Sequence, residues 1–194
     1  DKRSVDPNGA MPAKNMMVFK LAGMEPTAKV VYAASAGNWI MRHEPEIWAR
    51  TAKYVMLPTY LNYKLTGNLI DSASNQIGHI PFDYKNRRWM KPGSLTRCFC
   101  DVPNEKLCDL VPSGTVIGTI TDEVSALTGI PAGLPLISTG SDKGCETLGL
   151  AVVDSDKASI SLGTTATIQF STTQYVEPQQ FLPAYPGVLN DHYN

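Results

Sequence analysis

The sequence has no excess of charge of either sign and few charged residues altogether. Its 17 Lys and Arg residues are nearly matched by 18 Asp and Glu residues, so the formal net charge at pH 7 is -1. Because a broad basic surface is what attracts nucleic acids and anionic membranes, we expect neither as a partner. Charged residues make up 18% of the chain, below the roughly 25% of average soluble domains. A low charged content is typical of a chain that lies partly inside a larger protein.

Long apolar runs are missing as well. The longest uncharged stretch, residues 127–141, is interrupted by glycines and prolines and is shorter than the roughly 20 apolar residues of a membrane span. No apolar signal segment follows the charged opening Asp1-Lys2-Arg3, so the sequence gives no support for export. We therefore expect a cytoplasmic protein without a membrane span.

The cysteines lack the spacing of a disulfide framework or of paired zinc knuckles. They are Cys98, Cys100, Cys108 and Cys145. The favoured interpretation is four reduced thiols. Cys98 and Cys100 could form half of a metal site, but the three histidines lie far away in sequence, and we expect no protein-built metal site.

In the first half of the chain, proline and glycine mark the ends of predicted helices. Pro45 suits a first helical position, and apolar residues then recur at helical spacing up to Pro58, which we expect to break the helix. A second short helix should turn Tyr60, Leu61 and Leu65 inward and end at Gly67. Residues 70–101 are polar, and residues 83–86 predict a turn between two short strands. The basic residues at 85, 87 and 88 are interpreted as a solvated loop.

The second half has a different pattern. Residues 114–118 predict a short extended piece, followed by a helix that Thr121 caps and Gly129 ends. Residues 134–139 predict a buried strand, and the helix after it should bury a face with Cys145, Leu148, Gly149 and Val152. Two further strands, around residues 160–162 and 168–170, are joined through residues 163–165. We expect most of the helix to lie before Ser113.

Asp142 is the first candidate for chemistry. It follows a predicted strand and precedes a helix, the position at which open α/β sheets place ligands. An Asp there can cap the helix, or it can orient a hydroxyl nucleophile and receive its proton during phosphoryl transfer. The pattern alone favours neither role over the other.

The turn Gly163-Thr164-Thr165 is the second candidate. Consecutive backbone N–H groups can cradle phosphate oxygens, and glycine lets a ligand approach the backbone closely. Because Gly-Thr turns are common, an ordinary hairpin is favoured for this turn when it is considered by itself.

Four segments in order resemble the FGGY family of carbohydrate kinases. Residues 44–67 are similar to the helix and the "DYLNYRLTG" segment of the family, and residues 111–118 are similar to "VPPGTVIG". Residues 140–149 resemble the segment that holds the family's catalytic Asp, and residues 161–165 resemble the phosphate loop after it. Asp1-Lys2-Arg3 is similar to the end of the family's "W-x-D-x-R" segment.

The resemblance implies an α/β fold of the actin-like ATPase (ribonuclease H-like) type. Residues 1–155 would form the substrate-side part of the first lobe, and residues 156–194 the start of the second, nucleotide-side lobe. The implied function is phosphorylation of a sugar or polyol hydroxyl with ATP and Mg²⁺. Asp142 would be the catalytic base, and Gly163, Thr164 and Thr165 would bind the nucleotide phosphates.

Substrate contacts are implied for Asp1, Arg3 and Lys143. Lys143 stands where many members have Gln, and its charge in a first helical turn needs compensation. Glu146 is favoured for this over an anionic group on the substrate.

Two other functions remain alternatives. One is a non-catalytic sugar-binding or regulatory module that keeps the fold, and the other is an actin-like ATPase without a sugar substrate, which the "YLNYKLTG" and "GSDKG" segments disfavour. Because the family's first Asp-x-Gly-Thr phosphate loop is missing from these residues, we expect them to be inactive alone. The sequence leaves open which sugar is used and whether a homo-oligomer forms.

Overall fold

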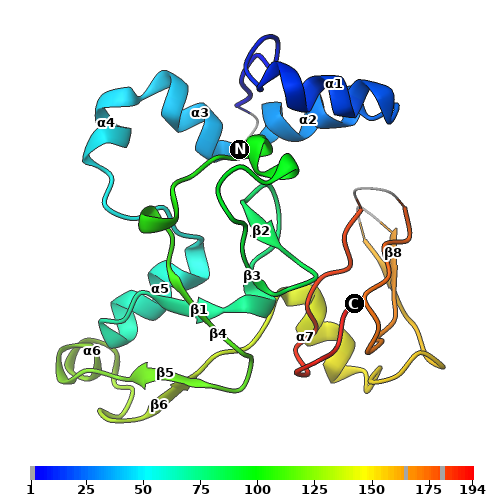
Figure 1. The fold of residues 1–194 in the computed structure, drawn as a ribbon. Helices are drawn as coiled ribbons and strands as arrows, with labels where there is room; N and C mark the ends of the chain where they lie inside the picture. The colour runs from blue at the N-terminus through cyan, green and yellow to red at the C-terminus, as the bar shows by residue number, and fades with distance from the viewer. Residues whose placement is uncertain (1–2, 164–165, 180–181) are drawn as a thin grey trace. The chain divides into compact units, whose positions relative to one another are not determined.

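The structure, a computed structural model, describes residues 3–163, 166–179 and 182–194 (Figure 1). The chain divides into two compact units. Unit 1 is formed by Asp1–Tyr54, Gly78–Asp83 and Trp89–Leu107, and unit 2 by Val55–Ile77, Tyr84–Arg88 and Cys108–Asn194. These units are a division within the chain, whereas the predicted boundary after residue 155 separates lobes of a whole kinase and stays a prediction.

Unit 1 contains four helices. They are α1 (Ala13–Leu21), α2 (Glu25–Ala34), α3 (Ala36–His43) and α4 (Pro45–Arg50). The sequence analysis above predicts none of the first three. α4 begins at Pro45 as predicted but is shorter than predicted, because Thr51 leaves the helical conformation. The chain then turns so that the N–H of Tyr54 can bind the carbonyl oxygen of Lys106 at 2.7 Å.

The core of unit 1 forms where short 3-10 turns bring the chain back. These turns are η2 (Leu95–Phe99) and η3 (Asn104–Lys106). Cys100, Val102 and Leu107 are buried there. Met41, Trp48, Tyr54 and Trp89 pack against them.

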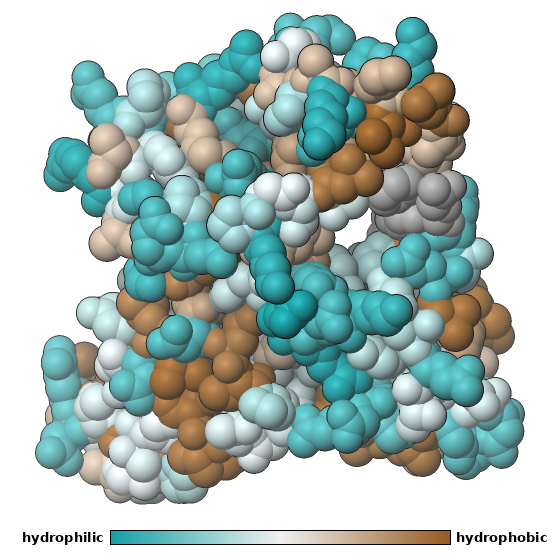
Figure 2. Space-filling model, in the orientation of Figure 1, coloured by the Kyte–Doolittle hydropathy of each residue, from teal (hydrophilic) through white to brown (hydrophobic). Residues whose placement is uncertain are grey.

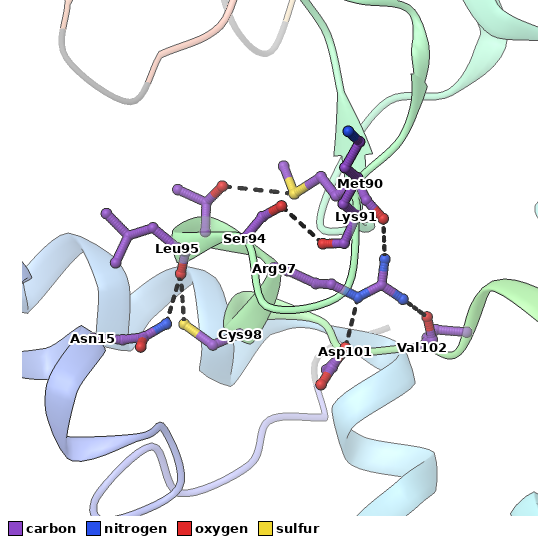
Figure 3. Close-up of polar contacts among 10 residues, drawn as sticks. Asn15, Met90, Lys91, Ser94, Leu95, Arg97, Cys98, Asp101 and Val102 are labelled. Atoms are coloured by element: carbon purple, nitrogen blue, oxygen red, sulfur yellow. Dashed lines mark hydrogen bonds and ion pairs between the residues drawn. The ribbon is translucent and has the colours of Figure 1, made fainter.

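A buried arginine holds this returning segment together (Figure 3). The side chain of Arg97 is 3% exposed, and its Nε lies 2.7 Å from the carboxylate of Asp101. Its two terminal nitrogens donate to the carbonyl oxygens of Met90 and Val102, each at 2.5 Å. Three acceptors therefore compensate the charge of a guanidinium that water does not reach.

Unit 2 begins with α5 (Leu57–Thr66), which lies beside the parallel strands β1 (Ile70–Ser72) and β4 (Asp109–Val111) (Figure 1). Gly67 ends the helix with a φ of 80°, as predicted. The prediction that Pro58 breaks a helix was wrong, because Pro58 lies in the first turn of α5. The predicted inward face was wrong for Tyr60 and Leu61, which are exposed, whereas Leu65 is half-buried and Thr59 is buried.

β2 (Phe82–Asp83) pairs with β3 (Arg88–Trp89) around the predicted turn. In unit 2, β5 (Val116–Thr119) pairs antiparallel with β6 (Pro135–Ile137). α6 (Asp122–Thr128) lies between β5 and β6 in sequence and has the predicted cap and stop, Thr121 and Gly129. The predicted solvated loop was wrong in part, because Arg87 binds the Asp191 carboxylate at 3.2 Å and lies over the ring of Tyr193.

The prediction that residues 134–139 form a buried strand was wrong. β6 has one strand partner, and Leu134, Pro135 and Ile137 are exposed. Figure 2 shows apolar surface in the region where Figure 1 draws β5, β6 and α5. A strand in a two-stranded pair lacks a second ladder partner, so its apolar content alone does not bury it.

The last elements are α7 (Asp142–Gly149), β7 (Ser159–Leu162) and β8 (Ala166–Gln169). α7 buries Gly144 and Thr147. Cys145, Leu148 and Gly149 are exposed, so of the predicted inward face only Val152, after the helix, is buried. As predicted, the larger share of the helix lies before Ser113. No helix among the described residues could cross a bilayer.

Candidate active site

The site is built at the start of α7. The loop from β6 reaches Ser141, which is not helical and whose Oγ accepts the N–H of Gly144 at 3.1 Å. Ser141 is therefore the N-cap, and Asp142 is the first residue inside the helix. The carboxylate of Asp142 accepts the N–H of Lys143 at 2.8 Å and is otherwise exposed. This arrangement settles the capping question that the sequence left open.

The loop before Asp142 is held by another part of unit 2. The N–H of Ser141 donates to the carbonyl oxygen of Ser74 at 3.1 Å. Gly140 is required here, because a Cβ at this residue would lie 2.7 Å from Cγ2 of Val188. The backbone that places Asp142 thus packs too closely for any side chain at residue 140.

Lys143 has two partners in the structure. Its Nζ lies 2.7 Å from the Glu146 carboxylate and 3.3 Å from Oγ of Ser161 in β7. Glu146 thus provides the compensation that the sequence favoured. The contact with Ser161 also links α7 to the strand that leads to Gly163.

A second contact joins α7 to the neighbouring strand β8. The hydroxyl of Thr147 lies 3.3 Å from Oε1 of Gln169 in β8. β7 and β8 pair with Ile160 opposite Ile168. Gly163 follows β7 directly and is exposed, so its backbone is accessible to a ligand. Thr164 and Thr165, the other predicted phosphate-binding residues, lie outside the described residues.

The predicted substrate residues near the start of the chain are in unit 1. Asp1 lies outside the described residues. The guanidinium of Arg3 lies 4.1 Å from the centre of the Trp39 ring, a distance at which a cation and an aromatic face attract each other. Asp142 and Lys143 are in unit 2, and the substrate role of Arg3 stays a prediction.

The sequence analysis missed a buried carboxylate in unit 2. Asp71 in β1 is 2% exposed, and its hydrogen-bond donors in the described part of the chain are all neutral groups. Desolvation, and to a lesser degree the charge of Asp71, raises the pKa of Cys108 to about 11. The polar run from Ser72 to Gln76 is the signal that could have pointed to Asp71.

A family comparison decides the identity of the fold. The family model of the N-terminal domain of FGGY carbohydrate kinases matches residues 15–149. The chain belongs to the FGGY family. The matched range ends with α7, so Asp142 and Lys143 lie inside it and Gly163 lies outside.

Similar proteins and structures agree with this assignment. An uncharacterised sugar kinase of Escherichia coli is 41% identical over 54% of this chain, and a xylulose kinase of Escherichia coli is 29% identical over 65%. The chain spans 21% and 25% of their lengths. A ligand-bound xylulose kinase structure from Lactobacillus acidophilus aligns with 93% of this chain and 38% of its own, at a TM-score of 0.72 and 21% identity.

The predicted α/β fold of the actin-like ATPase type is confirmed for the part of the domain that this FGGY chain covers. A kinase structure from Brucella ovis gives the same result, with a TM-score of 0.70 over 93% of this chain. Identity to both structures is 21%, so they establish the fold and not the substrate.

Proposed function

We propose that the full-length protein is a cytoplasmic kinase that phosphorylates a hydroxyl of a sugar or polyol with Asp142 as general base. The supporting observation is that capping of α7 falls to Ser141 and not to Asp142. Ser141 caps the helix, which leaves the Asp142 carboxylate exposed, and among the described residues the neighbouring N–H is its one hydrogen-bond donor. A carboxylate in this position can accept the proton of a substrate hydroxyl. None of the four cysteines, all of which lie in the described part of the chain, forms a disulfide, which fits a reducing compartment.

The helix contributes to the chemistry through its dipole. Asp142 lies in the first turn of α7, where the positive end of the helix dipole attracts negative charge. In the proposed reaction this carboxylate would accept the proton of the hydroxyl, whose oxygen bonds to the γ-phosphorus of ATP while the bond from that phosphorus to the leaving ADP breaks. Lys143 and Thr147 hold the β7–β8 hairpin to the same helix. The base and the Gly163 backbone are therefore supported by one element.

The described residues offer backbone to the phosphates of ATP but no cluster of side chains for Mg²⁺. When bound, ATP supplies the phosphoryl group and Mg²⁺ neutralises phosphate charge. Gly163 offers its accessible backbone to the phosphates. Within residues 3–163, 166–179 and 182–194, no group of three or more His, Cys, Asp or Glu side chains could hold a metal ion. Mg²⁺ in kinases is held by phosphate oxygens and water together with one or two carboxylates, so the metal would reach this site with the nucleotide.

A coupled ADP-release assay tests the proposal. The full-length protein is screened against pentuloses, hexuloses and polyols. The turnover of Asp142→Asn on the best substrate is then compared with that of the wild type. We expect turnover to fall about a hundred-fold or more, as for a lost general base. Asp122→Asn is the matched control, because Asp122 is also the first residue of a helix that the preceding residue caps.

Two outcomes would contradict the proposal. Normal turnover by Asp142→Asn would remove the general base assignment. Sugar binding in a calorimeter without ADP release by the wild-type protein would favour the non-catalytic sugar-binding module instead.

A further inference from the structure

Asp71 is a buried carboxylate without a cationic partner. Its oxygens accept from Oγ1 of Thr59 at 2.6 Å and from the N–H of Ser72 at 2.8 Å. Three side-chain amides complete the set at 3.1–3.4 Å: Asn62, Asn75 and Gln76. Among the described residues, none of the partners of Asp71 is a Lys, Arg or His. A buried charge needs compensation, and here five neutral donors provide it.

The arrangement depends on the Asp71 carboxylate, whose two oxygens accept hydrogen bonds and donate none. Both oxygens of an ionised carboxylate accept hydrogen bonds, whereas an asparagine would turn one of them into an N–H₂ group. That group would face the hydroxyl or amide donors that now bind Asp71. The buried donors would then lose their acceptor. Replacing one oxygen of Asp71 by nitrogen should therefore disrupt the hydrogen bonds around it.

The donors of Asp71 fix a tight turn. Ser72, Asn75 and Gln76 belong to the segment around η1 (Ala73–Asn75), and Oγ of Ser72 also accepts the N–H of Ser74 at 3.1 Å. The carbonyl oxygen of Ser74 is the group that binds the N–H of Ser141. Asp71 is thus connected to the residue before Asp142 through one turn of chain.

A second route leads from the same turn to the same loop. The hydroxyl groups of Ser72 and Ser113 lie 3.1 Å apart, and Ser113 donates to the carbonyl oxygen of Thr139 at 3.0 Å. Ser72 and Ser113 are both buried. The loop 139–141 is therefore fixed at two points, and both depend on the turn that Asp71 organises.

We propose that Asp71 is a positioning residue for Asp142: it fixes the Ser72–Gln76 turn, whose Ser74 carbonyl and Ser72 hydroxyl hold the backbone that carries the base. This inference rests on the proposed kinase function. A shift of about 1 Å in a catalytic group lowers turnover up to a hundred-fold, so the effect of Asp71 should appear in kcat.

The test uses Asp71→Asn in the full-length protein with the best substrate of the screen. We expect kcat to fall about ten- to a hundred-fold, while KM for the sugar and for ATP changes less than about three-fold, because the pocket itself is retained. Gly129→Ala is the control for stability alone. Gly129 ends α6 with a φ of 77°, which alanine adopts with strain, and this change should leave kcat within about two-fold.

Two further variants make the result decisive. Thr59→Val keeps the volume and removes the 2.6 Å bond to Asp71, so it should lower kcat in the same direction if Asp71→Asn fails to fold. In an Asp142→Asn background, Asp71→Asn should lower kcat little further, because a residue that acts through the base has no effect once the base is absent.

The outcomes separate the inference from the proposed function. If folded Asp71→Asn and Thr59→Val keep kcat at the level of Gly129→Ala, or if only KM rises, Asp71 is not a positioning residue. An additive loss in the double variant would lead to the same conclusion. If Asp142→Asn retains full turnover, the general base assignment fails and the positioning role fails with it.

Discussion

Oγ of Ser141 accepts the N–H of Gly144 at 3.1 Å, and this bond separates two roles that adjacent residues could each have filled. Serine and aspartate are equally good caps. Because Ser141 takes the capping position, Asp142 enters the helix with its carboxylate exposed. Stability and chemistry at this helix end therefore depend on different side chains.

Ser141→Ala should lower the free energy of unfolding by about 1 kcal/mol, the usual loss for a missing cap. It should leave kcat within a few-fold, because the backbone bond from Ser141 to Ser74 does not use the hydroxyl. Asp142→Asn should show the reverse pattern. Urea unfolding and the ADP-release assay measure the two effects. A large loss of stability in Asp142→Asn would mean that Asp142 has a capping role after all.

Lys143→Gln should change KM for an uncharged sugar less than about three-fold. The ammonium already has Glu146 and Ser161 as partners, and an ion pair this exposed contributes about 1 kcal/mol or less. Glu146→Gln is the matched variant, because it frees the cation without removing it. If KM of Lys143→Gln rises and the rise disappears at high salt, the substrate has an anionic group that Lys143 binds.

Arg97→Met should lower the free energy of unfolding by about 3 kcal/mol, because it leaves the buried carbonyl group of Val102, the half-buried one of Met90 and one carboxylate without their donor. Arg50→Met is the matched control: Arg50 is exposed in α4 of the same unit, and its loss should be within about 0.5 kcal/mol. Denaturant titration compares them. Equal losses in the two variants would show that the Arg97 network contributes no more than a surface arginine.

Local rules explain what the sequence predicted correctly. Thr121 and Gly129 bound α6, and Gly67 ends α5, because caps and left-handed glycines act through their own few residues. The inner face of α5 could not be read in this way. Thr59 is buried instead of Tyr60 because its hydroxyl binds Asp71, and a partner twelve residues away leaves no periodic pattern.

The candidate site shows the same limit. Motif order located Asp142, Lys143 and Gly163, and helical spacing gave Glu146 as the partner of Lys143. Neither motif order nor helical spacing could find Asp71 or Arg97. A buried charge is recognised by its partners, and those partners come from other segments. Nor did the pattern predict Ser141 as the cap, since an aspartate at residue 142 suits that position as well.

Cys108 provides a prediction about pH. Burial, followed by the charge of Asp71, raises the pKa of its thiol from 9.0 to about 11. Below pH 9 the thiol is neutral in the folded and the unfolded chain, and its contribution to stability is fully present. Between pH 9 and 11 the unfolded chain ionises first, so the free energy of unfolding should fall by up to about 2–3 kcal/mol. Cys108→Ala should flatten this part of the profile.

Thiol labelling measures the same property one cysteine at a time. At pH 8 a thiol with a pKa of about 11 has roughly a hundred-fold less reactive thiolate than an ordinary one, and burial slows Cys108 further. Cys145 is exposed and should react first. Mass spectrometry of peptides after timed iodoacetamide treatment gives the order, and a Cys145→Ser variant confirms the fast phase. If Cys108 reacts as fast as Cys145 in the folded protein, then the thiol is neither buried nor close to the charge of Asp71.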